Sequence, residues 1–279
     1  MHIFKEIEPL KQHLQHKKKA GFSVGLVPTM GALHDGHLAL VKASKKATGV
    51  TVCSLFVNPT QFNNPADLEK YPRTLEKDIA MLESAECDIL FAPETATMYE
   101  KPGIIRFDFG DLDKVMEGKF RPGHFNGVAI VVTKLFNIVE PNEAFFGQKD
   151  YQQFQVVSKL VDELKFNLKL HSVPIVREPN GLAMSSRNQR LTDEQRTKAG
   201  ILHQSLSDAR KQLLAGKPWK EVQSDVTAKI GKAKELQLEY FELAHRDDLT
   251  QKNNVDITKG IILTACFVGG VRLIDNMLV

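Results

Sequence analysis

Two histidines lie three positions apart in the run His34-Asp35-Gly36-His37. On a helical turn, side chains at this spacing point to the same side. Each imidazole can donate a hydrogen bond, and each gains a positive charge when it is protonated near neutral pH. The pair therefore suits a polyphosphate, whose negative charge grows as its bond to the neighbouring phosphorus breaks.

Two simpler interpretations of the pair fit less well. An ordinary turn with two solvated histidines does not account for Gly31, for Gly36 or for the Pro28-Thr29-Met30 approach. A zinc site of the His-Glu-x-x-His type needs histidines four positions apart and a third ligand, and the segment offers neither. We therefore interpret the segment as phosphate-binding.

A strand and a helix must position this segment. The apolar run 24–27 is short enough for a buried strand, and a helical pattern starts at about Leu38 and meets no Pro or Gly before Gly49. Ligands of open α/β sheets bind outside the carboxyl ends of the strands. Unpaired N–H groups and the helix dipole favour an anion there, so the pattern predicts a phosphate site.

A neutral amide follows the next predicted strand, residues 50–57. This strand stops at Asn58-Pro59, which we interpret as a turn because proline has no N–H for a sheet ladder. Gln61 comes directly afterwards. Its amide can orient hydroxyl and carboxylate groups without adding charge, which makes it a candidate substrate-binding group.

A lysine marks a third junction. A short strand ends at Phe145-Phe146, and a helix with one apolar face follows from about Asp150. Lys149 then lies at the positive end of the helix dipole, where a cation is easier to understand if an anion lies in front of it. Gln153, off the apolar face in the first turn, can reach the same pocket.

A polar loop, residues 182–188, precedes the C-terminal helices. In it Ser185, Ser186 and Arg187 can supply several donors to phosphate oxygens. An ordinary polar loop before a helix is the alternative.

Three more polar residues have open roles. Asp78 fits a solvated helix face better than a place near a metal-bound phosphate. Arg121 and His124 precede a helix, and their pattern fits contact with substrate and simple exposure equally well.

Composition excludes several classes of protein. The 279 residues carry 37 basic and 34 acidic side chains, a balance that gives no basis for a nucleic-acid or membrane partner. Cys53, Cys87 and Cys266 are far apart and form no C-x-x-C motif, which predicts buried free thiols in a reducing compartment. Because the chain shows neither a signal peptide nor an apolar run of about 20 residues, we expect a cytoplasmic protein.

The order of predicted elements indicates two domains. Strands and helices alternate as far as residue 176, and helices followed by strands come afterwards. We predict an α/β fold with a Rossmann-like parallel sheet and flanking helices over residues 1–175, and a smaller α+β domain over 176–279. Residues 3–19 read as one amphipathic helix, and Thr192 with Gln195 forms a capping box.

Several of these motifs carry a family resemblance. The run from Pro28 to His37 contains the His-x-Gly-His element of the nucleotidylyltransferase superfamily and resembles the pantoate–β-alanine ligases within it. The segments 56–62, 71–74 and 147–153 are similar to the same family. The Met184-Ser185-Ser186-Arg187 run resembles the mobile phosphate-binding loop of the superfamily, which can close over ATP and exclude water.

The resemblance implies an ATP-dependent ligation of pantoate and β-alanine through pantoyl adenylate, with release of pyrophosphate and AMP. It implies that His37, His34 and Lys149 are catalytic, that Gln61 and Gln153 bind the substrates pantoate and β-alanine, and that residues 176–279 form a lid. The ATP-binding residues that it implies are Met30, Gly31, Ala32, Leu33, His34, Asp35, Gly36, His37, Gly147, Gln148, Lys149, Asp150, Val176, Met184, Ser185, Ser186 and Arg187.

The resemblance also implies Mg²⁺ held mainly by the phosphates, without a dedicated protein metal site, and a homodimer. Two alternative functions stay open. A nucleotidylyltransferase would adenylylate a phosphorylated acceptor as its final product. A non-catalytic nucleotide sensor would keep the ATP pocket without needing the two glutamines.

Overall fold

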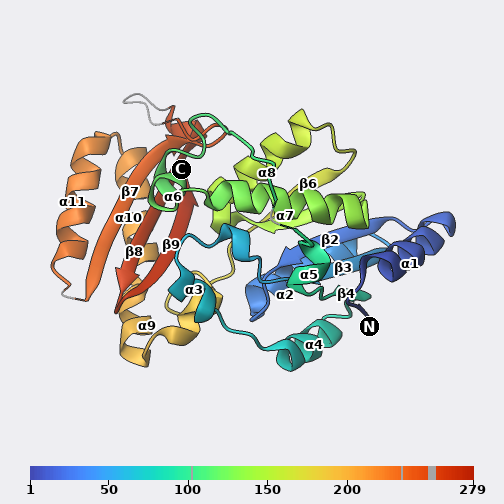
Figure 1. Ribbon diagram of the computed structural model, residues 1–279. Helices are drawn as coiled ribbons and strands as arrows, with labels where there is room; N and C mark the ends of the chain where they lie inside the picture. Colours follow the sequence, from blue (N-terminus) through green and yellow to red (C-terminus); the bar gives the residue numbers. More distant parts are fainter. Residues whose placement is uncertain (102, 234, 251–255) are drawn as a thin grey trace. The chain divides into compact units, whose positions relative to one another are not determined.

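The computed structural model describes residues 1–101, 103–233, 235–250 and 256–279 (Figure 1). Contacts within the chain divide it into two compact units. Unit 1 contains residues 1–148 and 153–174, and unit 2 contains residues 149–152 and 175–279.

Unit 1 is built on a six-stranded sheet in which every neighbouring pair of strands is parallel. The strand order is β1-β4-β3-β2-β5-β6, so the chain leaves β2 in one direction and later returns on its other side at β5. This reversal marks the place where α/β sheets open a crevice at their carboxyl end. The strands are β1 (His2–Phe4), β2 (Val24–Thr29), β3 (Val50–Leu55), β4 (Ile89–Phe91), β5 (Glu143–Gly147) and β6 (Lys169–Val173).

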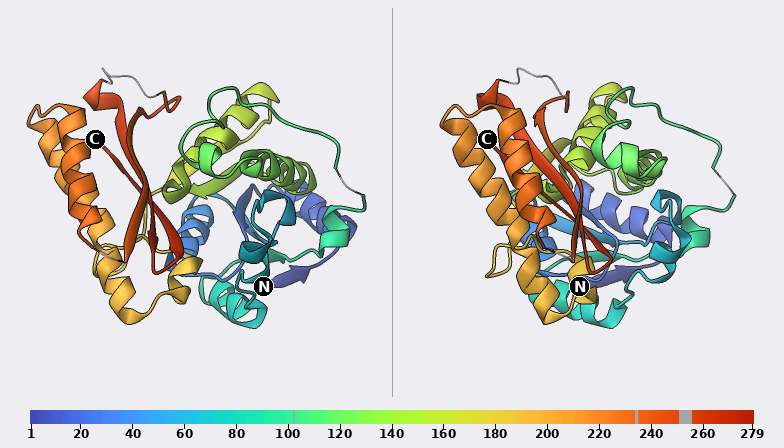
Figure 2. Two further views of the ribbon diagram at one scale, coloured as in Figure 1. Left: turned by 60° about the vertical axis from the view of Figure 1, so that its left-hand side comes forward. Right: turned by 90° about the vertical axis from the view of Figure 1, so that its left-hand side faces the viewer.

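Helices cover both faces of this sheet, as Figures 1 and 2 show. One apolar cluster joins α1, α7 and α8 to one face, and a second joins α2 and α4 to the other. Neighbouring residues of one strand serve the two clusters, as Leu26 and Val27 do, because side chains alternate along a strand. The helices are α1 (Ile7–Lys19), α2 (Asp35–Ala47), α3 (Pro65–Glu69), α4 (Leu75–Ser84), α5 (Thr95–Met98), α6 (Met116–Phe120), α7 (His124–Val139) and α8 (Tyr151–Glu163), with 3₁₀ turns η1 (Pro59–Gln61) and η2 (Gln148–Asp150).

Unit 2 packs helices on a three-stranded antiparallel sheet (Figure 1). The tight turn predicted at Gly269-Gly270 joins the last two strands, and both glycines have positive φ. The predicted capping box of Thr192 and Gln195 is present, but its helix ends at Ala199 and a new one begins after Gly200. The elements are η3 (Ser186–Arg190), α9 (Asp193–Ala199), α10 (Ile201–Leu214), α11 (Trp219–Gly231), β7 (Leu236–His245), η4 (Ile257–Lys259), β8 (Gly260–Val268) and β9 (Val271–Leu278).

Two predicted boundaries differ from the structure. Residues 3–19 are not one helix, because His2–Phe4 pairs in parallel with Ile89–Phe91 and α1 begins only at Ile7. The predicted first domain included residues 149–152, which the structure groups with unit 2. Inside that unit, the Asn276 amide donates to the Lys149 carbonyl at 2.9 Å, and the Tyr151 hydroxyl donates to the Arg246 carbonyl at 2.9 Å.

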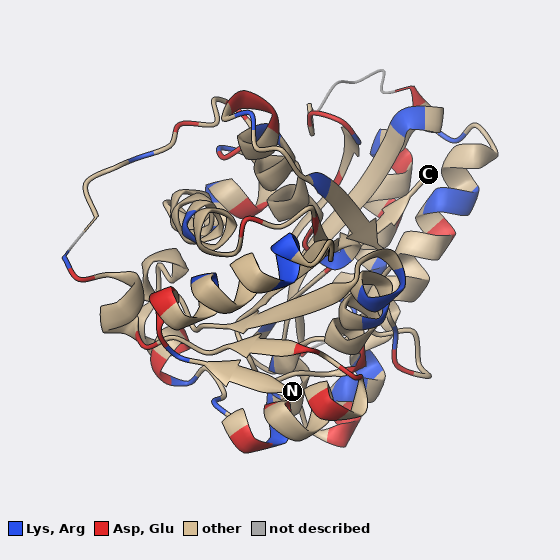
Figure 3. Ribbon diagram, turned by 90° about the vertical axis from the view of Figure 1, so that its right-hand side faces the viewer, with Lys and Arg blue, Asp and Glu red and all other residues tan. Residues whose placement is uncertain are grey.

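The thiols and charges agree with the composition. The cysteines are free and buried, and burial raises the pKa of Cys87 to about 11 and that of Cys266 to about 12, so both stay protonated near neutral pH. Lys and Arg are interspersed with Asp and Glu along the ribbon (Figure 3). Within the part of the chain that the structure describes, no helix is both long and apolar enough to cross a bilayer.

Candidate functional site

The turn after β2 has a conformation that few residues adopt. Gly31 has φ +81° and Ala32 has φ +50°, both in the left-handed region. Three successive amides of the turn are bonded inside unit 1. The N–H of Gly31 donates to Thr29 Oγ1 at 3.3 Å, and those of Ala32 and Leu33 donate to the Asp78 carboxylate at 2.9 and 2.8 Å.

The two histidines then form a reciprocal cap on α2. His34 Nδ1 accepts the Gly36 N–H at 3.1 Å, and His37 Nδ1 accepts the His34 N–H at 3.3 Å. Their ring centroids lie 4.0 Å apart. Because an accepting nitrogen carries no hydrogen, each ring in this arrangement holds its proton on Nε2. The caps therefore favour neutral rings with the proton on Nε2.

These bonds occupy the backbone N–H groups that were expected to bind an anion. The sequence predicted unpaired N–H groups at this helix start, and for residues 31–34 and 36 that prediction is wrong, because each of these N–H groups already has an acceptor in unit 1. Asp78 is also not on a solvated helix face, because it has no exposed surface. These five amides are therefore already used inside unit 1.

Gln61 is held by a buried network after β3. Its Oε1 accepts from the Asn58 amide at 3.1 Å, and its Nε2 donates to Met30 Sδ at 2.9 Å. Asn58 is 1% exposed and also accepts from the Tyr99 hydroxyl at 2.9 Å. A Cβ at Gly127 would lie 2.4 Å from the Thr60 carbonyl oxygen, so only glycine lets α7 approach η1 this closely.

A chain of polar groups supports Gln61 from α6 and α7. Arg121 Nη1 donates to His124 Nε2 at 3.0 Å, since a guanidinium cannot accept. His124 Nδ1 must then carry the ring proton, and it donates to the Gln61 carbonyl at 2.8 Å. Glu117, 6% exposed, lies 3.6 Å from Arg121. Of the two roles left open, simple exposure is therefore wrong for His124, which is 5% exposed.

Lys149 and its neighbours follow β5. Gly147 ends the strand, and Gln148, Lys149 and Asp150 form η2. The Lys149 side chain is 17% exposed, and its ammonium lies 3.6 Å from an Asp150 oxygen. Gln153, in the first turn of α8, is half-buried.

The serine-arginine loop is anchored inside unit 2. The Met184 N–H donates to the Val176 carbonyl at 3.0 Å, and Ser185 Oγ accepts the Arg187 N–H at 3.3 Å, which starts η3. Ser186 is 6% exposed. The Val176 carbonyl is thus already hydrogen-bonded, and Val176 is half-buried.

The structure brings some of the predicted residues together. In unit 1 the turn at 30–37 is joined to Gln61 through Met30. In unit 2 the Lys149 segment is bonded to β9, and Ser185, Ser186 and Arg187 share one short helix with its cap.

Sequence reasoning missed Asn58, Asp78 and Glu117 as parts of this network. Asn58 had a usable signal, since it directly follows a buried strand. Glu117 had one too, because Arg121 follows it at the helical i,i+4 spacing. Asp78 had none for its contact with the turn, because the groups that it accepts from there are backbone amides of a distant segment.

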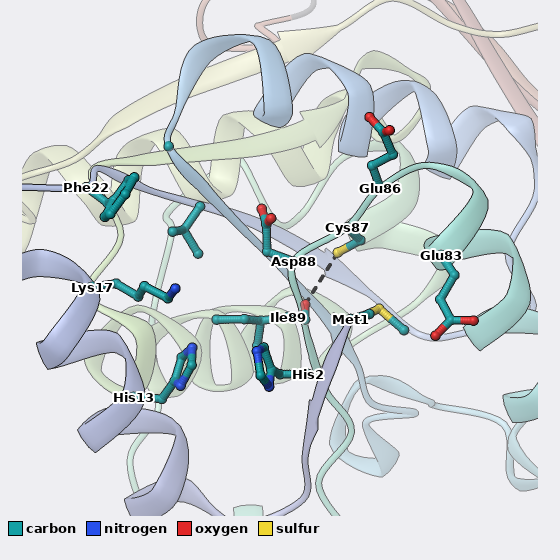
Figure 4. Close-up of a pocket in the computed structure, with 12 residues that line it drawn as sticks. Met1, His2, His13, Lys17, Phe22, Glu83, Glu86, Cys87, Asp88 and Ile89 are labelled. Carbon is teal, nitrogen blue, oxygen red and sulfur yellow. Dashed lines mark hydrogen bonds between the residues drawn. The ribbon is translucent and has the colours of Figure 1, made fainter. Parts of the chain in front are cut away.

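A cavity of about 630 Å³ lies elsewhere in unit 1, at the amino ends of the strands (Figure 4). Figure 4 shows the rings of His2 and His13 beside each other, and their centroids are 4.9 Å apart. Lys17 and Asp88 also line this cavity, and no residue of the predicted site does.

Comparison with known proteins settles the family. Residues 2–278 match the model of the family described as pantoate-beta-alanine ligase. The chain belongs to this family. It is 46% identical to the pantothenate synthetase of Cytophaga hutchinsonii over 275 residues, which are 98% of this chain and 97% of that protein. It is also 46% identical to the pantothenate synthetase of Carboxydothermus hydrogenoformans over 283 residues, 100% of this chain and 99% of that protein.

Solved structures of the pantoate–β-alanine ligase family agree with the fold. The pantothenate synthetase from Thermus thermophilus matches with TM-score 0.93 and 38% identity, covering 100% of this chain and 99% of that one. The pantoate–β-alanine ligase from Francisella tularensis, complexed with an ATP compound and β-alanine, matches with TM-score 0.82 and 35% identity over 100% of this chain and 97% of that one. The predicted parallel sheet with a smaller α+β part is confirmed, as is the prediction of a ligase.

Proposed function

We propose that this chain joins pantoate to β-alanine in two steps, with ATP as the activating substrate. The observation that carries the proposal is the match of residues 2–278 to the pantoate–β-alanine ligase family. The Francisella ligase, crystallised with an ATP compound and β-alanine, supports both of these substrates for its relatives.

In the first step a pantoate carboxylate oxygen bonds to the α-phosphorus of ATP, and the bond from that phosphorus to the bridging oxygen of pyrophosphate breaks. The leaving group gains negative charge, so donors that are already in place lower the barrier. We assign this role to His34 and His37 through their Nε2–H groups, and to Lys149. The capped rings support the assignment because their donors need no reorientation.

In the second step the neutral amine of β-alanine attacks the activated carbonyl carbon, and the bond to AMP breaks. The nitrogen loses a proton, and pantothenate and AMP leave. This route avoids direct attack on a carboxylate, which is a poor acceptor for an amine. No covalent enzyme intermediate is required, so orientation and charge stabilisation carry the catalysis.

We assign pantoate to Gln61 and Gln153. The Gln61 amide is held from both ends by Asn58 and Met30, so its orientation is fixed before substrate arrives. We also assign ATP contacts to residues 30–37, 147–150, 184–187 and Val176, and a lid function to residues 176–279. The N–H groups of Ala32 and Leu33 and the Val176 carbonyl are already hydrogen-bonded within the chain. We therefore expect these three residues to contact ATP through their side chains or their other backbone groups.

Magnesium enters this proposal as part of the substrate. Among the described residues, no group of three His, Cys, Asp or Glu side chains is arranged to hold a metal ion. The donors that face the proposed phosphates are imidazole and ammonium groups, and Mg²⁺ prefers oxygen ligands. Mg²⁺ carried by the phosphate oxygens of ATP fits these residues, and it would neutralise phosphate charge.

The test supplies ATP, Mg²⁺ and pantoate, first without β-alanine and with hydroxylamine as a trap. We expect pyrophosphate and pantoyl hydroxamate in equal amounts. In a separate reaction without hydroxylamine, β-alanine should yield AMP and pantothenate in a one-to-one ratio. Absence of β-alanine-dependent AMP release contradicts the proposal, and a stable adenylylated product would favour the nucleotidylyltransferase alternative.

The proposal also includes an oligomeric state and a location in the cell. Family membership supports a homodimer, which light scattering coupled to gel filtration tests, and a monomer at micromolar concentration would contradict it. The three buried free thiols support a reducing, cytoplasmic location, which cell fractionation with thiol labelling tests.

A further inference from the structure

A buried carboxylate holds the turn that precedes the two histidines. Asp78 belongs to the first turn of α4 and has no exposed surface. Its Oδ2 accepts the Ala32 N–H at 2.9 Å, and its Oδ1 accepts the Leu33 N–H at 2.8 Å. The Thr74 hydroxyl donates to Oδ1 at 3.2 Å. This side chain thus joins two segments of unit 1 that are far apart in the sequence.

No cation explains the burial of this charge. Across residues 1–101, 103–233, 235–250 and 256–279, no Lys, Arg or His forms an ion pair with Asp78. A carboxylate without water is costly unless hydrogen bonds to the charged form replace its hydration. An amide of the same size would cost less to bury, but it has only one acceptor oxygen and would meet one of the two N–H groups with its own donor.

Asp78 bonds to a stretch of backbone whose conformation is unfavourable for a residue with a side chain. Ala32 has φ +50°, which L-residues rarely adopt. A Cβ on Gly31 would lie 3.2 Å from Asp78 Oδ2 and 3.0 Å from Leu55 Cδ2, so the carboxylate is packed against the turn as well as bonded to it. His34 follows this turn directly and begins α2.

We propose that Asp78 is a positioning residue for the adenylylation step: by holding the amides of Ala32 and Leu33 it sets the direction in which His34 and His37 present Nε2 to the phosphates. The inference rests on the proposed function. Asp78 itself touches no substrate. Misplacing reacting groups by about 1 Å costs about 10²-fold in rate, so the effect appears in kcat.

The test compares Asp78→Asn with a matched substitution, Asp88→Asn. Asp88 is another aspartate of unit 1 that accepts a backbone N–H, from Thr51 at 2.8 Å, and it also pairs with Lys45 at 3.0 Å. It lies at the amino end of β4. Both variants replace a carboxylate that accepts a backbone N–H. In Asp88→Asn the remaining oxygen can still accept from Thr51, whereas in Asp78→Asn the remaining oxygen cannot accept from both Ala32 and Leu33.

We expect Asp78→Asn to lower the single-turnover rate of adenylate formation by roughly 10- to 100-fold, with the KM for ATP changed less than about threefold. Asp88→Asn should lower the melting temperature and leave the rate per folded molecule within about twofold of the native rate. Rates are measured at about 15 °C on protein whose folded fraction is verified by circular dichroism. A folded Asp78→Asn enzyme with the native rate overturns the inference.

A second pair keeps the test decisive if Asp78→Asn does not fold. Thr74→Val removes the hydroxyl that orients Oδ1, and Thr74→Ser retains it. We expect Thr74→Val to slow adenylate formation about 3- to 10-fold and Thr74→Ser to keep at least about half of the native rate. Equal rates in the two variants contradict the inference.

The wild-type enzyme separates this inference from the function on which it rests. If the wild type itself forms no pantoyl adenylate, the proposed function fails. If it does form the adenylate and the Asp78 and Thr74 variants match it, only the positioning role fails.

Discussion

The two ends of the parallel sheet of unit 1 use similar side chains in different ways. At the carboxyl end, His34 and His37 are fixed by backbone hydrogen bonds, and Asp78 is buried on two backbone amides. At the amino end, His13 Nε2 is buried and has no hydrogen-bond partner among the described residues, and the Asp88 side chain is 35% exposed beside Lys45. The two ends therefore differ in their histidines: His34 and His37 are oriented by hydrogen bonds, and His13 Nε2 is not.

This difference indicates which end of the sheet is the better candidate for the active site, which the balanced charge of the chain does not. Both ends contain histidines and an aspartate, and the amino end also has a cavity of about 630 Å³ (Figure 4). What distinguishes the carboxyl end is that its histidines are held by hydrogen bonds, whereas His13 Nε2 at the amino end has no partner among the described residues. Orientation before binding is what lowers a barrier, so we place the chemistry there rather than in the cavity.

The largest effect should come from removing a phosphate donor. His37→Ala and Lys149→Ala are each expected to slow adenylate formation by about 10²- to 10³-fold, because each removes a group that stabilises charge in the transition state. Lys17→Ala, which changes a lysine of the amino-end cavity, should leave the rate within about twofold of the native rate. Single-turnover quench measurements decide, and a normal rate in either of the first two variants shows that the phosphate site is misplaced.

A smaller effect is expected from the amide network. Asn58→Asp keeps the acceptor for Tyr99 but replaces the N–H₂ group that donates to Gln61 and to the Gly127 carbonyl. The KM for pantoate should rise about 10-fold, since oxygen then faces oxygen. Tyr99→Phe should raise it only about two- to threefold. A pantoate KM that responds equally to both changes would argue against an oriented Gln61.

The turn itself can be tested with a pair of glycines. Gly31 and Gly21 have similar φ, +81° and +86°, but a Cβ meets Leu55 and Asp78 only at Gly31. Gly21→Ala should cost about 1–2 kcal/mol of unfolding free energy from the backbone alone, and Gly31→Ala about 1–3 kcal/mol more. Only Gly31→Ala should also slow turnover, by about 3- to 10-fold. Urea unfolding and steady-state rates distinguish the two, and equal losses would mean that the close packing against Asp78 is unimportant.

The smallest effect concerns pH at the amino end. Burial, then the charges of His2, Lys17 and His16, lower the pKa of His13 from its ordinary 6.5. As the pH falls below 6.5 the unfolded chain takes up a proton that the folded chain does not, so stability is lost until the pH passes the lowered pKa. His13→Gln should reduce the fall in melting temperature between about pH 7.5 and 5.5 and leave kcat unchanged.

A matched histidine serves as the control for that measurement. His16 lies on the same helix and is exposed, so His16→Gln should retain the acid sensitivity of the wild type. A His13→Gln protein that loses as much stability in acid as the wild type would show that His13 is not the group responsible.

The local features of the fold were predictable from the sequence. The buried strands at β2 and β3, the turn at Gly269-Gly270 and the Thr192 capping box all follow from neighbouring residues. β1 was missed because three residues carry no periodicity, and only pairing with β4 makes them a strand. Gly200 ended a helix that periodicity alone would have continued.

In the candidate site, too, local features could be predicted and contacts between distant segments could not. Histidine spacing and glycine positions mark the turn at residues 30–37, and a glutamine after a strand marks Gln61. The link from Asp78 to the turn could not be found in this way, because it runs to backbone amides 45 and 46 positions away, which no side-chain pattern marks. The place of Asp78 in an ordinary helix pattern pointed to solvent instead.

A crystal structure with pantoate and a non-hydrolysable ATP analogue tests most directly whether His34 and His37 bind the phosphates. We expect phosphate oxygens about 3 Å from Nε2 of His34 and His37, with Asp78 still bonded to the N–H groups of Ala32 and Leu33. Phosphates bound instead by the amides of residues 31–33, with the Asp78 carboxylate displaced, would contradict this expectation.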